Sequence, residues 1–176
     1  MGLFGKQKIS ETAIAGQFVL HVCRGVEESW PKIAEELREL FRDDASVLDD
    51  QFAPFEFALA VVATQMQALP NLLSADQAAR IRSHIVCCLC SDKLGTYPAE
   101  AIDEYQAAWD RSLQVPEPPY DRIASVLFDK FGCSDKVSIG KASFKSPTML
   151  MALGSAVVTF GGQFWKAAVS QYRIVT

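Results

Sequence analysis

The chain has 176 residues, of which 49% are hydrophobic and 22% are charged. This composition is typical of a globular protein and excludes a largely disordered chain, and the length suits a single domain over residues 1–176 with its own core. Five cysteines, an odd number, exclude a disulfide scaffold and indicate reduced thiols. We therefore expect a cytoplasmic location, the more so because the first residues lack the apolar run of a signal peptide.

The charges are unevenly distributed along the chain. All 21 acidic residues lie at or before Asp135, whereas five of the 17 basic residues follow it, and the net charge is −4. We interpret this as a basic C-terminal segment that packs across an acidic body. No expected helix carries a basic recognition face, so we expect no binding to nucleic acid.

Most of the chain is predicted to form amphipathic helices, because apolar residues recur at helical spacing. Ser10 is the expected N-cap of the first helix, and residues 1–9 before it are expected to be loosely attached. Ser74 and Gln77 form a capping box, the clearest helix start in the chain. The expected helices cover approximately residues 11–28, 30–42, 54–69, 74–91, 99–113 and 120–131.

The third of these segments, residues 54–69, carries a single charge, Glu56, and should be largely buried. Residues after Gly132 are harder to assign. VSIGKASFK alternates partly, which indicates a short strand, and the later VVTFGGQFWK has the pattern of a hairpin closed by Gly161 and Gly162. We predict an all-α, single-domain bundle of about seven helices with a largely buried C-terminal helix. The alternative is an α+β fold with a small hairpin after Gly132.

Residues 146–165 contain no charge and are long enough to cross a bilayer. On a helix, however, Thr148, Thr159 and Lys166 form a polar stripe beside wide apolar bands. Such a stripe is typical of a packing helix in a globular domain with one edge at water. We therefore expect this helix to be central in the bundle. Gly154 and Gly161 lie on one side of it and are a candidate interface for helix packing or for an oligomer.

The densest cluster of chemically capable side chains is formed by His84, Cys87 and Cys88, which are candidate metal ligands. Helical spacing argues against them, because it directs Cys88 to the core and Cys87 to one side. We interpret the cluster as structural and assign no metal, no cofactor and no catalytic residue. The chain also lacks a nucleophile elbow and a phosphate loop.

Three functions remain open. We expect a non-enzymatic protein-interaction or regulatory domain, which implies a protein partner or self-association. The first alternative is an enzyme or small-ligand-binding protein with a pocket assembled from residues distant in sequence. The second is a membrane-associated protein that uses the basic, apolar C-terminal segment. For a pocket, the first candidates are Arg80, His84, Tyr105 and Trp109.

Overall fold

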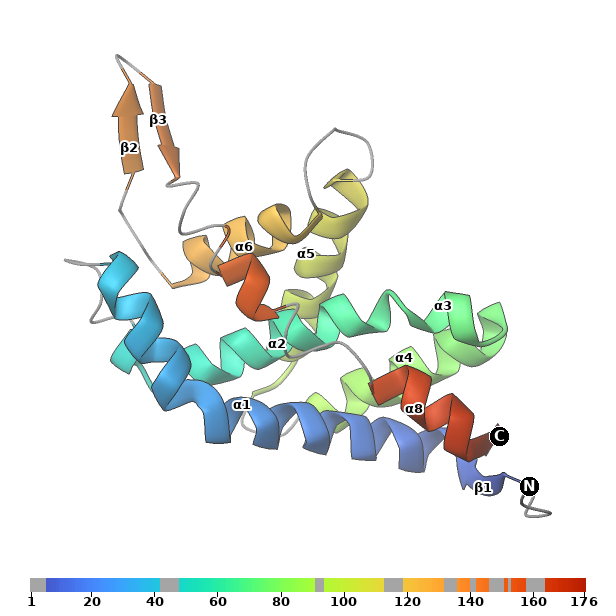
Figure 1. The fold of residues 1–176 in the computed structure, drawn as a ribbon. Coiled ribbons are helices and arrows are strands. Elements are labelled where there is room, and N and C mark those ends of the chain that lie inside the picture. The colour runs from blue at the N-terminus through green and yellow to red at the C-terminus, as the bar shows by residue number, and fades with distance from the viewer. Residues whose placement is uncertain are drawn as a thin grey trace.

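The computed structural model describes residues 6–41, 48–90, 94–112, 119–131, 136–139, 142–145, 151, 153–157 and 164–176. It is an all-α helical fold, as predicted (Figure 1). The helices are α1 (Glu11–Phe41), α2 (Ala53–Met66), α3 (Leu69–Leu72), α4 (Ala75–Leu89), α5 (Tyr97–Ser112), α6 (Pro119–Lys130) and α8 (Phe164–Gln171). The strands are β1 (Gln7–Ser10), β2 (Lys136–Ile139), β3 (Ala142–Lys145) and β4 (Tyr172–Val175). Met151 and residues 153–157 are also helical.

Helix α1 joins the two helices that we expected at residues 11–28 and 30–42. Pro31 lies inside it, where proline removes one backbone hydrogen bond and bends a helix without necessarily ending it. The helix changes direction in its second half (Figure 1). Apolar residues are buried on both sides of the proline, among them Val26, Ile33 and Ala34. Tertiary burial therefore outweighs the local cost of the proline.

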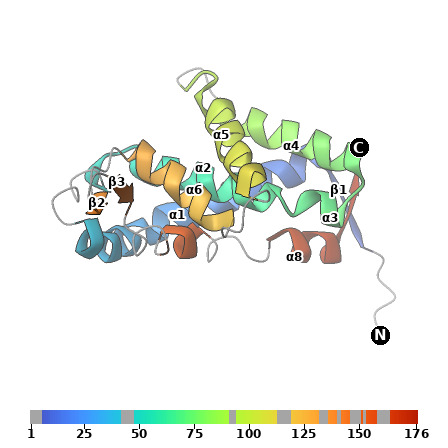
Figure 2. The same ribbon diagram turned by 90° about the horizontal axis from the view of Figure 1, so that it is seen from above.

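Helix α2 occupies the centre of the fold. It contacts α1, α5 and α6, and most of its residues are buried (Figures 1 and 2). A helix that is hydrophobic on all sides belongs in a core. The prediction that this segment is largely buried is confirmed. It is α2 that takes the central position we expected for the C-terminal helix.

In the described part of the C-terminal segment some apolar residues are buried and Met151 is exposed, and the helical part ends before residue 173. Leu153, Val157 and Trp165 are buried, and the Trp165 and Phe18 rings lie 4.8 Å apart. Helix α8 ends at Gln171, and the chain continues as strand β4. The polar stripe included Thr148 and Thr159, which lie outside the described residues. Among the described helices, none is both long and apolar enough to cross a membrane.

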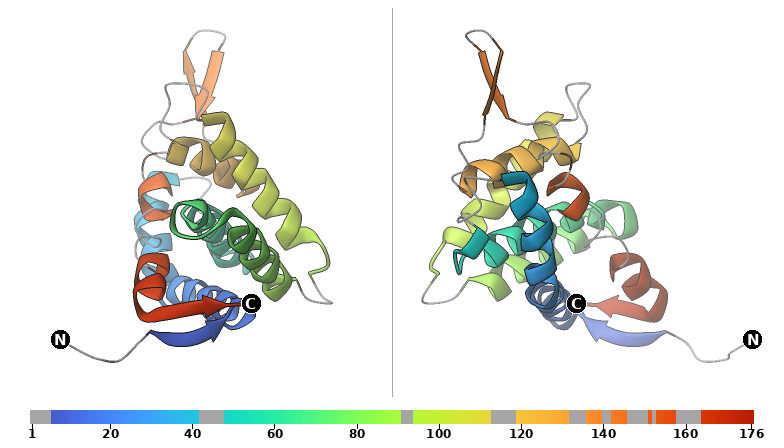
Figure 3. Two further views of the ribbon diagram at one scale, coloured as in Figure 1. Left: turned by 90° about the vertical axis from the view of Figure 1, so that its right-hand side faces the viewer. Right: turned by 60° about the vertical axis from the view of Figure 1, so that its left-hand side comes forward.

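Strands β1 and β4 bring the two ends of the chain together as a parallel pair, with Gln7 opposite Tyr172 and Ser10 opposite Val175. Figure 3 shows both strands at one end of the molecule. The Lys6 ammonium also donates to the carbonyl of Val169 at 2.5 Å. Residues 7–9 are therefore held against the C-terminal strand, and our expectation that they are loosely attached was wrong. Residues 1–5 lie outside the described part.

A second pair of strands, β2 and β3, forms an antiparallel hairpin with Lys136 opposite Lys145. It projects from the helical body (Figures 1 and 3). The hairpin after Gly132 therefore exists, but as an addition to an all-α fold. The other expected hairpin turn, Gly161 and Gly162, lies outside the described residues.

The start of α1 is held against α4 by a paired carboxylate. The Glu11 side chain is only 3% exposed, and Arg80 donates to it from Nε at 2.8 Å and from Nη2 at 2.9 Å. These hydrogen bonds hold the pKa of Glu11 below its ordinary value of 4.5, against the opposing effect of burial. A buried carboxylate needs such a partner, since its desolvation is otherwise uncompensated.

We predict that the Glu11–Arg80 pair makes the fold sensitive to acid. A carboxyl whose pKa is lowered by folding stabilises the protein above its unfolded-state pKa, and that stabilisation is lost as the pH falls through the folded-state value. Below about pH 4.5, the wild type should therefore lose stability more steeply than Glu11→Gln in urea unfolding at a series of pH values. Glu35→Gln, at an exposed position of α1, should behave like the wild type. Identical acid profiles for the wild type and Glu11→Gln would contradict the prediction.

Candidate functional site

The site is built around Glu56, which lies in the first turn of α2 and has a side chain that is 8% exposed. The hydroxyl of Tyr105 donates to Glu56 Oε1 at 2.7 Å, and the hydroxyl of Tyr97 donates to Oε2 through a short hydrogen bond. Both tyrosines belong to α5. The N-terminal end of a helix dipole also favours a negative charge at this position. The carboxylate is thus compensated although it is buried.

Lys130, the last residue of α6, completes the network. Its ammonium lies 2.9 Å from Glu104 Oε2 and 3.8 Å from Glu56 Oε1. It also stands 5.3 Å from the ring centroid of Tyr97 and 5.9 Å from that of Tyr105, distances at which a cation is attracted to a ring face. Helices α2, α5 and α6 are therefore joined by one set of charged and hydroxyl groups.

The two tyrosines and Lys130 of this network have raised pKa values. Burial, and then the hydrogen bond to Glu56 and its charge, raise the pKa of Tyr97 to about 12. Burial also raises the pKa of Tyr105. For Lys130, burial lowers the pKa, but the hydrogen bond to Glu104 and the charge of Glu56 outweigh it and the net shift is upward. All three shifts lead away from neutrality, which is the opposite of what acid–base catalysis near pH 7 requires.

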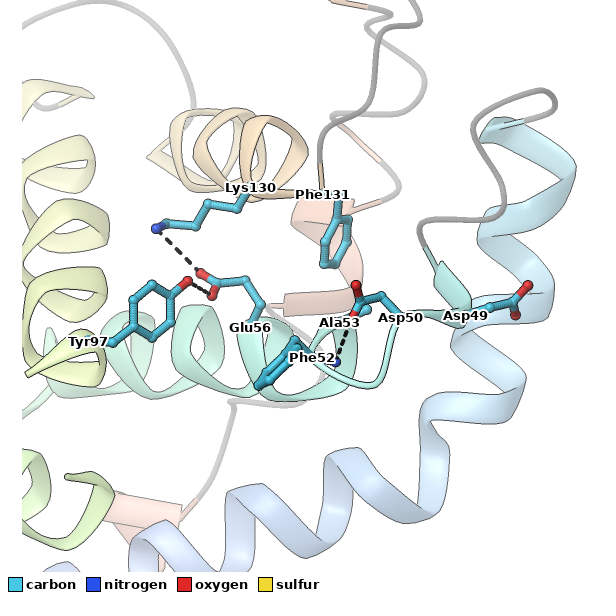
Figure 4. A pocket seen from close by; sticks show the side chains of 8 residues that line it. All are labelled: Asp49, Asp50, Phe52, Ala53, Glu56, Tyr97, Lys130 and Phe131. Carbon is cyan, nitrogen blue, oxygen red and sulfur yellow. Dashed lines mark hydrogen bonds and ion pairs between the residues drawn. The ribbon is translucent and has the colours of Figure 1, made fainter. Parts of the chain in front are cut away.

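A cavity of about 550 Å³ opens above this network, and we call it the Glu56 cavity (Figure 4). Phe52, which is 57% exposed, and Tyr97, which is 42% exposed, stand at its edge. Asp50 Oδ1 accepts a hydrogen bond from the backbone N–H of Phe52 at 2.8 Å, which fixes the turn before α2. The cavity is lined by Asp49, Asp50, Phe52, Ala53, Glu56, Tyr97, Lys130 and Phe131.

Of the four pocket candidates from the sequence, only Tyr105 belongs to the network around Glu56. Arg80 is engaged by Glu11 at the other end of the fold. His84 lies on α4 with Nε2 3.5 Å from the Thr12 hydroxyl, and Trp109 is partly buried on α5. The four residues do not form a common site.

The candidate metal ligands do not converge in the described structure. Among the described residues, no three His, Cys, Asp or Glu side chains are placed to hold a metal ion. Cys87 and Cys88 are both exposed, so our expectation that Cys88 points to the core was wrong. The buried stripe of helix α4 consists instead of Ile81, Ile85 and Leu89. Cys88 lies at the edge of this stripe.

Gly154, one half of the proposed small-residue interface, is buried in the helical residues 153–157. Its expected companion, Gly161, lies outside the described residues. The interface that we predicted through these two glycines therefore stays a prediction.

Most residues of the site could not be recognised from the sequence. Glu56 carried a signal, because it is the single charge of an otherwise apolar helix and such a charge must find partners. No such sequence signal exists for Phe52, Tyr97 and Lys130, since each resembles an ordinary surface residue next to a turn or a helix end. Their proximity follows from the packing of α2, α5 and α6.

No protein-family model, curated protein or solved structure matches this chain.

We predict that Tyr105→Phe destabilises the fold more than Tyr97→Phe. Tyr105 is fully buried, so its loss deprives Glu56 of a donor that water cannot easily replace, at a cost of about 1–3 kcal/mol. Tyr97 is partly exposed, and water can take its place. Urea unfolding at neutral pH measures both, with Tyr172→Phe, at a partly buried strand position, as the control. A cost for Tyr105→Phe no larger than that of the control would show that the hydrogen bond to Glu56 contributes little.

We also predict that the contribution of Tyr97 disappears at high pH. Its pKa is raised from the ordinary value of 10 to about 12, so the folded state favours the neutral phenol. This stabilisation is complete below pH 10 and is lost as the pH rises toward 12. The difference in unfolding free energy between the wild type and Tyr97→Phe should therefore shrink over this range. In an ultraviolet titration of the folded protein, Tyr97→Phe should lack one late-ionising tyrosine, and an unchanged titration would count against the assignment.

Proposed function

We propose that this chain is a non-enzymatic interaction domain and that the Glu56 cavity is where a protein partner binds. One observation carries the proposal. The described surface exposes four large apolar side chains, Leu20, Phe52, Tyr97 and Met151, and two of them stand at the edge of this one cavity. Aromatic residues beside a cavity are typical of the energetic centre of a protein interface.

The network below the cavity supports binding because it holds one wall in place. Tyr97 is fixed by its hydrogen bond to Glu56 and by the Lys130 ammonium near its ring. Phe131 packs against Trp30 with the ring centroids 6.2 Å apart. A surface that is ordered before binding loses less conformational entropy when a partner arrives.

The charges of the cavity indicate the chemistry of the partner. The lining contains the carboxylates of Asp49, Asp50 and Glu56 but only one ammonium, that of Lys130. Asp49 is paired with Arg38, whereas the described residues offer no cationic partner to Asp50. A segment with a basic side chain among apolar residues would complement both the carboxylates and the aromatic edge, since charge complementarity speeds association and selects partners.

A second candidate function is the binding of a small molecule in the same cavity. Its volume of about 550 Å³ lies in the range of ligand pockets, and its lining is assembled from residues far apart in sequence, from Asp49 to Phe131. The exposed aromatic edge favours the protein partner, because a small ligand gains most from enclosed walls. Self-association would use the same edge, with a second copy as the partner.

Two further expectations stay proposals. Four cysteines, Cys23, Cys87, Cys88 and Cys90, are free thiols, which supports a reducing compartment such as the cytoplasm. Membrane association through the C-terminal segment has weaker support, because Trp165 and Ala168 of α8 are buried in the fold and leave less apolar surface for lipid.

Selection from a displayed library of random peptides would test the partner site. Peptides enriched on the wild type should bind Phe52→Ser at least about tenfold more weakly, because aromatic residues at an interface centre commonly contribute that much. Leu20→Ser is the matched control, since Leu20 is 50% exposed but does not line the cavity. Its affinity for the same peptides should be unchanged.

The outcomes of this selection separate the candidate functions. Failure to enrich any peptide, or equal weakening by both variants, would contradict a partner site at the Glu56 cavity. A concentration-dependent dimer of the wild type that Phe52→Ser abolishes would identify a second copy of the chain as the partner.

A further inference from the structure

A second cavity lies between the C-terminal end of α2, α3, α4 and α5, and shares no residue with the Glu56 cavity. Its volume is about 290 Å³. Figures 1 and 2 show how α3 and α4 follow α2, with α5 beside α4. It is lined by Met66, Gln67, Leu69, Pro70, Ala75, Ala78, Ala79, Arg82, Gln106 and Asp110. We call it the Gln106 cavity.

Gln106 is the unusual member of this lining. The residue is 7% exposed, and its carbonyl oxygen Oε1 is buried without a hydrogen-bond partner among the described residues. Buried acceptors are nearly always paired, because an unpaired one has lost its water without compensation. The terminal torsion of a glutamine is soft, so a rotation of the amide can turn the oxygen toward a donor in the cavity.

Six of the other lining residues are apolar, and the polar ones are Gln67, Arg82 and Asp110. Met66, Leu69 and Pro70 form one side, and α4 contributes the alanines Ala78 and Ala79, whose small side chains leave the space open. The volume equals that of about ten water molecules, which is room for a molecule of about ten non-hydrogen atoms. The body of such a molecule should be apolar.

The charges at the cavity select the polar end of the ligand. Asp110 follows Gln106 by one helical turn and therefore lies on the same face of α5. No cation among the described residues pairs with Asp110. Arg82, the cation of the lining, is engaged by Asp103 at 2.8 Å. Beside the amide of Gln67, which can donate and accept, the cavity offers a neutral carbonyl from Gln106 and a carboxylate from Asp110, and its own cation is already paired.

We propose that the Gln106 cavity binds a small organic ammonium ion with an apolar body. The ammonium donates one hydrogen bond to the carbonyl oxygen of Gln106 and another to the carboxylate of Asp110. The body packs against Met66, Leu69 and the alanines of α4. This site is independent of the partner site proposed above.

Titration of the ¹⁵N-labelled full chain with benzylammonium chloride, followed by NMR, tests the proposal. Benzyl alcohol and sodium benzoate have nearly the same size and serve as matched probes. Benzylammonium should shift the side-chain amide signals of Gln106 and the backbone signals of α4 and α5. Benzoate should leave them unchanged, and benzyl alcohol should bind at least about fivefold more weakly than benzylammonium, because the charge-assisted hydrogen bond is the stronger one.

Variants identify the groups that hold the ammonium. Gln106→Leu and Asp110→Asn should each weaken benzylammonium binding at least about fivefold, by loss of one hydrogen-bond acceptor or one charge. Asp76→Asn removes an exposed carboxylate of α4 outside the cavity and should have no effect. Gln106→Leu also removes the unpaired carbonyl. The variant should therefore fold, and its thermal unfolding midpoint should be no lower than that of the wild type.

Several results would overturn the proposal. They are the absence of any shift at millimolar benzylammonium, equal binding of benzoate, shifts confined to another part of the molecule, and unchanged affinity in both Gln106→Leu and Asp110→Asn. Phe52→Ser should bind benzylammonium normally, which keeps this test separate from the test of the partner site.

Discussion

The structure depends on the buried carboxylate of Glu56. A buried charge on an apolar helix is tolerated only if other groups compensate for the water that it has lost. Here the compensation comes from the hydroxyls of Tyr97 and Tyr105 on α5 and from the Lys130 ammonium at the end of α6. One side chain of α2 thereby fixes how two further helices lie against it.

The same requirement shapes the surface above Glu56. The groups that compensate the carboxylate reach the outside, since Tyr97 is half exposed and Lys130 lines the cavity. Both keep their protons at neutral pH, because burial raises the pKa of Tyr97 and the neighbouring carboxylates raise that of Lys130 against the effect of burial. What they provide is an ordered, partly aromatic and partly acidic surface, on which the proposed partner site rests.

The two cavities differ in how their polar groups are satisfied. Around Glu56 the carboxylate, the hydroxyls and the ammonium compensate one another. The cavity above them is nevertheless open to the surface. In the Gln106 cavity a buried carbonyl has no partner among the described residues. The first arrangement favours a partner that lies across the edge, and the second favours a small molecule that enters. A second compensated carboxylate, that of Glu11 with Arg80, anchors α1 to α4.

The sequence by itself determined the helical class, the positions of most helices and the burial of residues 54–69, because hydrophobic periodicity and capping are local properties. It also showed Glu56 as the single charge of that segment. Only the tertiary structure decided that Tyr97, Tyr105 and Lys130 are those partners, that Pro31 lies within one helix, and that β1 pairs with β4. These are contacts between residues far apart in the chain, and their energies depend on packing and desolvation, which no local pattern encodes.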